Sequence, residues 1–172
     1  MIPAAALAIV AWIVYFPMIV EAVHAARNER IQFARGGLEP PADVYKIMRI
    51  AYPGVFAAML LEGALRGLAE NAWLAAGLLV FTAGKALKWW AIVTLGRAWT
   101  FRVVVVPGEQ LVVSGPYRFL RHPNYVGVLF ELVGVAVMMR AYVSGPLAVV
   151  LFGSLVLKRI SVENRALAEG AQ

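Results

Sequence analysis

Residues 1–26 read MIPAAALAIVAWIVYFPMIVEAVHAA and carry no charged side chain before Glu21. The hydrocarbon core of a bilayer is about 30 Å thick, and a helix needs about 20 mainly apolar residues to cross it. The stretch therefore predicts a membrane-spanning helix. The rest of the chain has the same character, because 62% of its 172 residues are hydrophobic and only 15% are charged. Soluble domains average roughly 45–50% apolar and about 25% charged residues, so the composition indicates an integral membrane protein.

Four further apolar stretches follow, at residues 45–65, 72–95, 125–139 and 142–157. The polar residues 27–43 contain a Gly-Gly and a Pro-Pro pair, which predicts a loop between the first two spans. Only Arg140 and Ala141 separate the last two spans, and such a short connection predicts a tight antiparallel helical hairpin. We therefore expect an all-α integral membrane protein of about five transmembrane helices, organised as a single domain over residues 1–172.

The basic residues predict how these spans are oriented. Five spans place the two termini on opposite sides of the membrane. Twelve lysines and arginines fall on one side and only Arg66 and Arg140 on the other, while Lys85 and Lys88 lie within the third span. Cytoplasmic loops carry the excess of basic residues. We therefore expect the N-terminus outside and the C-terminus in the cytoplasm, in a bacterial inner membrane, and we interpret the net charge of +6 as topology rather than as nucleic-acid binding.

The composition also restricts the chemistry. The chain has no cysteine, which excludes disulfides, thiolate metal sites and a cysteine nucleophile. Its two histidines, His24 and His122, are too few for a multi-histidine metal centre. We expect no metal ion.

Charged residues inside the spans are candidates for function, because an ionisable group in the bilayer costs several kcal/mol. Glu131 lies six residues into the fourth span. For Lys88 we expect a structural role, either a buried ion pair or a side chain that extends to the membrane surface. The roles of Lys85 and Glu131 stay open between function and a structural pair. Glu21, near the end of its span, is expected to be solvated.

Residues 94–127, TLGRAWTFRVVVVPGEQLVVSGPYRFLRHPNYVG, differ from the apolar spans on either side. Two β-prone runs, 103–106 and 111–113, flank a Pro-Gly-Glu-Gln turn and predict a short β-hairpin-like loop. Unpaired backbone groups are not tolerated in lipid, so this loop should lie at the cytoplasmic surface.

The end of this stretch is expected at the membrane boundary. Pro123 disfavours a regular helix through His122, and Tyr125 begins the fourth span. Arg121, His122 and Tyr125 therefore lie beside the cytoplasmic mouth of the helices. One interpretation is that Arg121 meets lipid phosphates and Tyr125 belongs to an interfacial aromatic belt. The other is a ligand site.

The stretch GPYRFLRHPNYVG, residues 115–127, resembles the isoprenylcysteine carboxyl methyltransferase family and its relatives among the phospholipid methyltransferases. The family elements appear in order as Leu95-Gly96 with Trp99, Gly115 with Tyr117, Arg121-His122-Pro123 with Tyr125 and Gly127, and Arg159 with Glu163. The resemblance covers roughly residues 94–167. It implies an integral membrane enzyme that uses S-adenosylmethionine.

The resemblance also implies site residues. The cofactor pocket would lie at the cytoplasmic side and be formed by Tyr117, Arg121, His122, Pro123, Tyr125, Gly127 and Glu163. Arg159 and Glu163 would lie near the point of methyl transfer as catalytic residues. The implied partner is a lipophilic small-molecule or prenylated acceptor that reaches the site from the membrane lipid.

The spacing of Arg159 and Glu163 is compatible with these roles. At i and i+4 they share one helix face, and an arginine fork suits a substrate carboxylate. A carboxylate acceptor is already ionised and needs no base. A phenol or enol must lose a proton, for which His122 or Glu163 is a candidate base. The alternative is a helix-end ion pair contributing only about 0.3–0.5 kcal/mol.

The sequence therefore favours an enzyme that transfers a methyl group from S-adenosylmethionine to an oxygen of a lipophilic substrate, either a carboxylate or a phenol or enol. Two alternatives remain at this point. One is an NADPH-dependent membrane enzyme similar to the sterol reductases. The other is a non-catalytic membrane scaffold whose basic loops bind anionic lipid.

Overall fold

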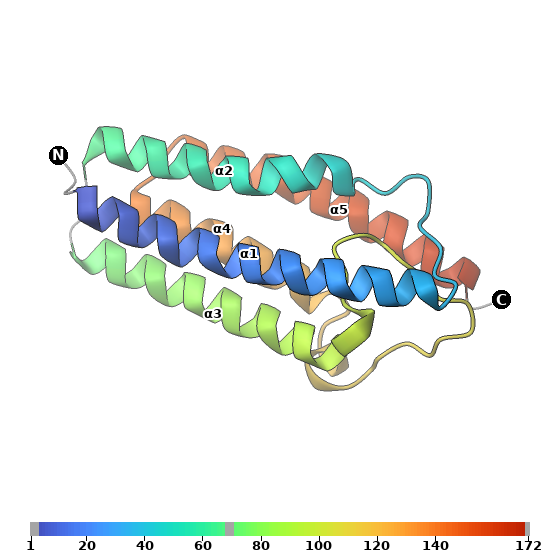
Figure 1. Cartoon of the computed structure of the whole chain (residues 1–172). Coiled ribbons are helices and arrows are strands. Elements are labelled where there is room, and N and C mark those ends of the chain that lie inside the picture. Colours follow the sequence, from blue (N-terminus) through green and yellow to red (C-terminus); the bar gives the residue numbers. More distant parts are fainter. Residues whose placement is uncertain (1–3, 68–70, 171–172) are drawn as a thin grey trace.

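The computed structural model describes residues 4–67 and 71–170 and shows five long helices in this part of the chain (Figure 1). They are α1 (Ala4–Ala34), α2 (Tyr45–Arg66), α3 (Asn71–Leu95), α4 (Pro123–Met139) and α5 (Ser144–Gly170). Two short 3-10 turns, η1 (Gly96–Ala98) and η2 (Gly115–Arg118), lie between α3 and α4. This architecture confirms the predicted all-α membrane fold.

Four of the described helices, α1, α2, α3 and α5, are long and apolar enough to cross a membrane. The apolar helix α4 has 17 residues and is therefore about 25 Å long at 1.5 Å per residue. Consecutive helices alternate in direction, so the two ends of the chain lie at opposite ends of the bundle (Figure 1). Which end faces the cytoplasm stays a prediction from the basic residues.

Helix α1 is longer than its apolar part, because it continues through polar residues that were predicted to form a loop. Buried Asn28 explains the extension. Its Nδ2 donates to the carbonyl oxygens of Gly96 and Trp99 at 2.9 and 2.7 Å. Gln32, one turn later, is 2% exposed and donates to a carbonyl of the same segment at 2.8 Å. The polar end of α1 therefore supports the chain that follows α3. Of the loop predicted over residues 27–43, the part up to Ala34 was wrong because it is helical, and the part after Ala34 is confirmed.

The β-hairpin predicted before α4 does not form in the described residues. The backbone of Val105 instead pairs with Leu38, through N–H to carbonyl distances of 2.8 and 3.0 Å. A turn does form at the Pro-Gly pair, where the N–H of Glu109 donates to the carbonyl of Val106 at 3.2 Å. The segment at Val105 therefore pairs with the connection between α1 and α2 rather than with residues 111–113.

Helices α3 and α4 pack closely along two pairs of glycines. Gly77 on α3 faces Gly134 on α4, and Gly84 on α3 faces Gly127 on α4. The two glycines on each helix are seven residues apart, which is about two helical turns. A Cβ atom on Gly84 would lie 2.8 Å from the carbonyl oxygen of Gly127. The absence of side chains here lets the two backbones approach, as in other membrane helix pairs.

The predicted hairpin of the last two helices is confirmed. Helix α4 ends at Arg140, whose φ of 49° is left-handed and reverses the chain. Glu62 of α2 then holds the start of α5, because its carboxylate accepts the N–H groups of Val143 and Ser144 at 3.1 and 2.7 Å. Helix α5 therefore returns beside α4 (Figure 1).

Four charged residues and one tyrosine meet between α1, α2, α3 and α4, and we call them the ionic cluster. Lys85 lies 2.8 Å from Glu21 and 2.9 Å from Glu131. Lys88 lies 2.7 and 3.4 Å from the same two carboxylates, and the Tyr52 hydroxyl donates to Glu131 at 2.6 Å. Lys85 and Lys88 therefore form buried ion pairs with Glu21 and Glu131. This agrees with the interpretation of the sequence that gave these lysines a structural role. The expectation that Glu21 is solvated was wrong, since it is 1% exposed.

Candidate active site

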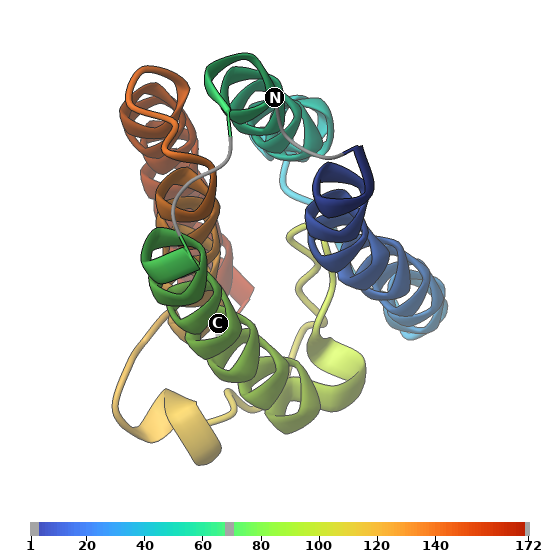
Figure 2. The same ribbon diagram turned by 90° about the vertical axis from the view of Figure 1, so that its left-hand side faces the viewer.

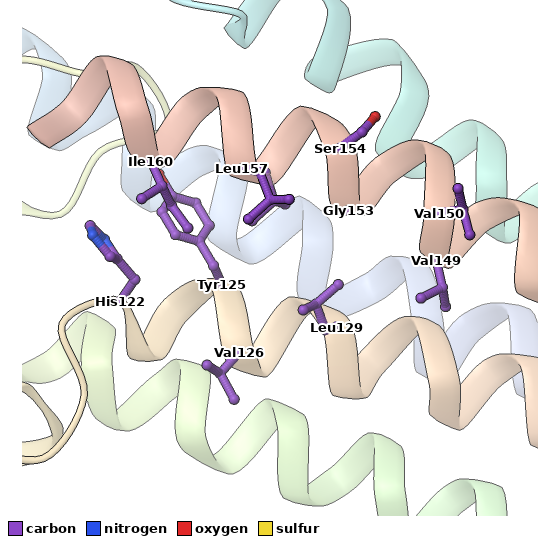
Figure 3. A pocket seen from close by; sticks show the side chains of 11 residues that line it. His122, Tyr125, Val126, Leu129, Val149, Val150, Gly153, Ser154, Leu157 and Ile160 are labelled. Carbon is purple, nitrogen blue, oxygen red and sulfur yellow. The ribbon is translucent and has the colours of Figure 1, made fainter.

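The candidate site begins where the chain enters α4. Pro123 is the first residue of the helix, a position that suits proline because its missing N–H has no partner there anyway. The N–H groups of Tyr125 and Val126 donate back to the carbonyl of His122 at 3.2 and 3.3 Å. This local geometry turns the side chains of His122 and Tyr125 toward α5 (Figure 3).

On α5 these two side chains meet Glu163 and Asn164, and we call the four residues the Glu163 cluster. The Tyr125 hydroxyl donates to Oε2 of Glu163 at 2.8 Å. Nε2 of His122 lies 3.2 Å from Oδ1 of Asn164, and its Nδ1 lies 3.9 Å from Oε2 of Glu163. The rings of His122 and Tyr125 are 5.6 Å apart. The Glu163 side chain is 31% exposed, so a ligand can reach it.

Arg159 lies beside this cluster, but its guanidinium is directed to other partners. Its Nε donates to the Tyr125 hydroxyl at 2.8 Å and its Nη1 to Oδ1 of Asp43 at 2.8 Å. Its Nη2 donates to the carbonyl of Phe101. The Arg159 side chain is only 7% exposed. The Tyr125 hydroxyl therefore links Arg159 to Glu163.

Asp43 is a site residue that the sequence analysis missed. Its side chain is 2% exposed. Besides Arg159, Oδ1 accepts the N–H of Tyr45 at 3.0 Å and Oδ2 accepts the N–H of Val103 at 2.8 Å. Asp43 thus joins the start of α2, the segment after α3 and helix α5. An aspartate just before a helix suggests a helix cap, and nothing in its neighbourhood in the sequence indicates the arginine.

The other predicted site residues fall into different places. Tyr117, in η2, is half-buried, and burial together with the negative charge of Glu163 raises the pKa of its hydroxyl above the ordinary value. Arg121 is exposed just before α4. Gly127 lies against the backbone of Gly84 on α3. The structure therefore places Gly127 in helix packing, and Tyr117 is close enough to Glu163 to feel its charge.

A groove of about 400 Å³ runs between α4 and α5 away from the cluster (Figure 3). Its lining is almost entirely apolar and consists of His122, Tyr125, Val126, Leu129, Val149, Val150, Gly153, Ser154, Val156, Leu157 and Ile160. Val150 and Leu157 on its rim are 67% and 69% exposed. The groove therefore opens on a surface that lipid covers, and its polar end is formed by His122 and Tyr125.

The structure thus combines long apolar helices with an apolar groove that ends at a polar cluster. The sequence model of the isoprenylcysteine carboxyl methyltransferase (ICMT) family matches residues 75–169, more than half of the chain, and the chain belongs to this family. The chain is therefore a membrane methyltransferase of this family, as the motifs predicted.

Individual relatives extend this comparison. The chain is 29% identical over 145 residues to "Uncharacterized protein YpbQ" of Bacillus subtilis, covering 84% of this chain and 86% of that protein. It is 34% identical over 101 residues to protein-S-isoprenylcysteine O-methyltransferase A of Arabidopsis thaliana, covering 57% of this chain and 51% of the plant enzyme. A probable enzyme of the same name from Oryza sativa subsp. indica is 38% identical over 85 residues, 48% of this chain and 42% of that enzyme. No solved structure matches the chain.

Proposed function

We propose that the protein transfers a methyl group from S-adenosylmethionine to an oxygen atom of a lipophilic acceptor, which enters from the bilayer through the groove between α4 and α5. One observation carries this proposal. The apolar groove ends at His122 and Tyr125, and these two side chains lie 3.9 and 2.8 Å from the partly exposed carboxylate of Glu163. From the distribution of basic residues, this end faces the cytoplasm.

The residues present fit S-adenosylmethionine in their chemistry. Its sulfonium is a cation, which a carboxylate and the faces of aromatic rings attract. Glu163 supplies the carboxylate, and the rings of His122 and Tyr125 lie close to it. Tyr117 is half-buried within the electrostatic range of Glu163, and the exposed guanidinium of Arg121 suits the carboxylate of the cofactor. We propose that these residues hold the cofactor, with Pro123 fixing the backbone that presents them.

When bound, the cofactor supplies a methyl carbon that an oxygen lone pair attacks, forming a C–O bond while the C–S bond breaks and its electron pair stays on sulfur. The work of the protein is then to align the two reactants and exclude water. The apolar side chains that line the groove contribute to both tasks. They hold a hydrocarbon tail in one direction, and they keep water out.

The surroundings of Arg159 favour one class of acceptor. Its Nε and both terminal nitrogens already donate to Tyr125, Asp43 and Phe101, and its side chain is only 7% exposed, so little of the guanidinium is left for an acceptor carboxylate. A phenol or enol has no need of this arginine. It needs a base for its proton, and Glu163 provides a carboxylate at the end of the groove. We therefore propose a phenolic or enolic acceptor, with Arg159 orienting Tyr125 and Glu163 taking the proton.

A radiolabel experiment tests this proposal. The protein in lipid nanodiscs is incubated with S-adenosylmethionine labelled in the methyl group and with fractionated lipid extracts. We expect label in the organic phase that survives mild alkali, as a methyl ether does. Label released as methanol would identify a methyl ester and overturn the choice of acceptor. Absence of any labelled lipid, together with no calorimetric binding of S-adenosylhomocysteine at millimolar concentration, would overturn the function.

A further inference from the structure

Residues 111–121, LVVSGPYRFLR, form a connecting segment with two different faces, and we call it the interfacial segment. Its inner face carries buried Pro116 and half-buried Tyr117. Its outer face carries large apolar side chains with exposed fractions of 63% for Leu111, 76% for Val113 and 74% for Phe119. Both charged residues of the segment, Arg118 and Arg121, are basic and exposed. A loop in water rarely combines three such apolar side chains with a purely basic charge.

The position of the segment explains this composition. Gly115 packs on the last turn of α3, where an added Cβ would lie 2.5 Å from Oγ1 of Thr94. Figure 2 shows η2 projecting sideways from the bundle, and in Figure 1 it lies level with the end of α3 rather than beyond it. Trp90 and Val93, in the same turn of α3, are 50% and 73% exposed. The outer face of the segment therefore continues the lipid-covered surface of α3 at the depth where that helix leaves the bilayer.

We propose that the interfacial segment inserts its outer face into the lipid leaflet at this end of the bundle and binds anionic lipid. Leu111, Val113 and Phe119 enter the boundary between headgroups and acyl chains, and Arg118 contacts lipid phosphates. Because His122 follows directly, insertion of the segment fixes the polar end of the groove relative to the membrane. The proposal does not depend on the identity of the acceptor or on methyl transfer.

Spin labels test the insertion, since the chain contains no cysteine that would interfere. Single variants Phe119→Cys and Val113→Cys are labelled and reconstituted in phosphatidylcholine vesicles with one quarter phosphatidylglycerol. Gln110→Cys, exposed next to the segment, is the control. We expect labels at 119 and 113 to be relaxed by oxygen and shielded from a water-soluble nickel chelate, and the label at 110 to behave in the opposite way. Nickel access at 119 and 113 equal to that at 110 would overturn insertion. Protection from both reagents would overturn it too, because it indicates cover by a second protein surface.

The charge of the lipid tests the second part of the proposal. We expect the label at 119 to show at least twofold lower nickel accessibility in the phosphatidylglycerol vesicles than in pure phosphatidylcholine. Arg118→Gln should abolish this difference, while Arg165→Gln, an exposed change on α5, should preserve it. Equal accessibility in both lipid mixtures, or a difference that survives Arg118→Gln, would overturn the role of anionic lipid.

Discussion

The ionic cluster and the Glu163 cluster are built from similar parts but differ in what their carboxylates meet. In each, a tyrosine hydroxyl donates to a glutamate, from Tyr52 to Glu131 at 2.6 Å and from Tyr125 to Glu163 at 2.8 Å. The side chain of Glu131 is 0% exposed and that of Glu163 is 31% exposed. The first glutamate has two lysine neighbours, while the second has a histidine ring and the end of an apolar groove.

This difference separates structure from chemistry. In the ionic cluster two lysines match two glutamates, so the charges sum to zero and leave no open side for a ligand. The charges tie α1, α3 and α4 together, because each one depends on partners from another helix, and Tyr52 adds α2 through its hydrogen bond to Glu131. In the Glu163 cluster the carboxylate keeps an exposed side beside a groove. The Asp43–Arg159 pair lies between these extremes, since it is buried but touches the Glu163 cluster through Tyr125.

The largest effect on stability is expected from Lys88→Met, which leaves two carboxylates to share one lysine. Breaking a buried ion pair from one side costs about 3–5 kcal/mol, and unfolding in detergent should show this loss. The double variant Lys88→Met with Glu131→Leu removes one charge of each sign and should be more stable than the single variant. A single variant as stable as the original protein would contradict a structural role of the cluster.

A smaller loss is expected from Asp43→Asn. The amide oxygen can still accept the N–H of Val103, but the amide NH2 group then faces the N–H of Tyr45 and the guanidinium of Arg159. Because Arg159 keeps its bonds to Tyr125 and Phe101, we expect a loss of about 3 kcal/mol in the free energy of unfolding, the lower end for a broken buried pair. The control is Glu109→Gln, which breaks the exposed pair with Arg35 and should cost less than about 1 kcal/mol. If the two variants unfold alike, Asp43 does not hold Arg159.

Glu163→Gln should change stability by less than about 1 kcal/mol, because the side chain is partly exposed and the amide can still accept from Tyr125. Methyl transfer to a phenolic or enolic acceptor should nevertheless fall at least about 100-fold, the lower end of what a general base contributes. Arg165→Gln, on the same helix and exposed, should transfer methyl at the original rate. Retained transfer by Glu163→Gln would exclude Glu163 as the base.

The smallest effect concerns Tyr117 and high pH. Burial and the charge of Glu163 raise the pKa of Tyr117 above its ordinary value of 10.0. Above pH 10 the unfolded chain therefore loses a proton that the folded protein keeps, and the free energy of unfolding should fall as the pH rises. Below pH 10 this tyrosine contributes no pH dependence. Tyr117→Phe should show a shallower decline in unfolding titrations between pH 10 and 11, and an identical slope would show that Tyr117 is not buried near the carboxylate.

The sequence by itself determined the helices and most of the motif. The second span was predicted at residues 45–65 and α2 is Tyr45–Arg66, because the need to shield the backbone in lipid is met within each helix. The resemblance also identified His122, Tyr125 and Glu163, which the structure brings together. These properties depend on runs of neighbouring residues, and a sequence displays such runs directly.

Only the tertiary structure decided how the polar groups are paired. Asp43 and Arg159 are 116 residues apart, and Glu21 and Lys85 are 64 apart, so no local pattern links them. The same holds for Val105, whose backbone pairs with Leu38 rather than within a hairpin. Buried polar groups require partners wherever the fold provides them. Their partners, and with them the difference between a closed ionic cluster and an open site, follow from which segments meet in space.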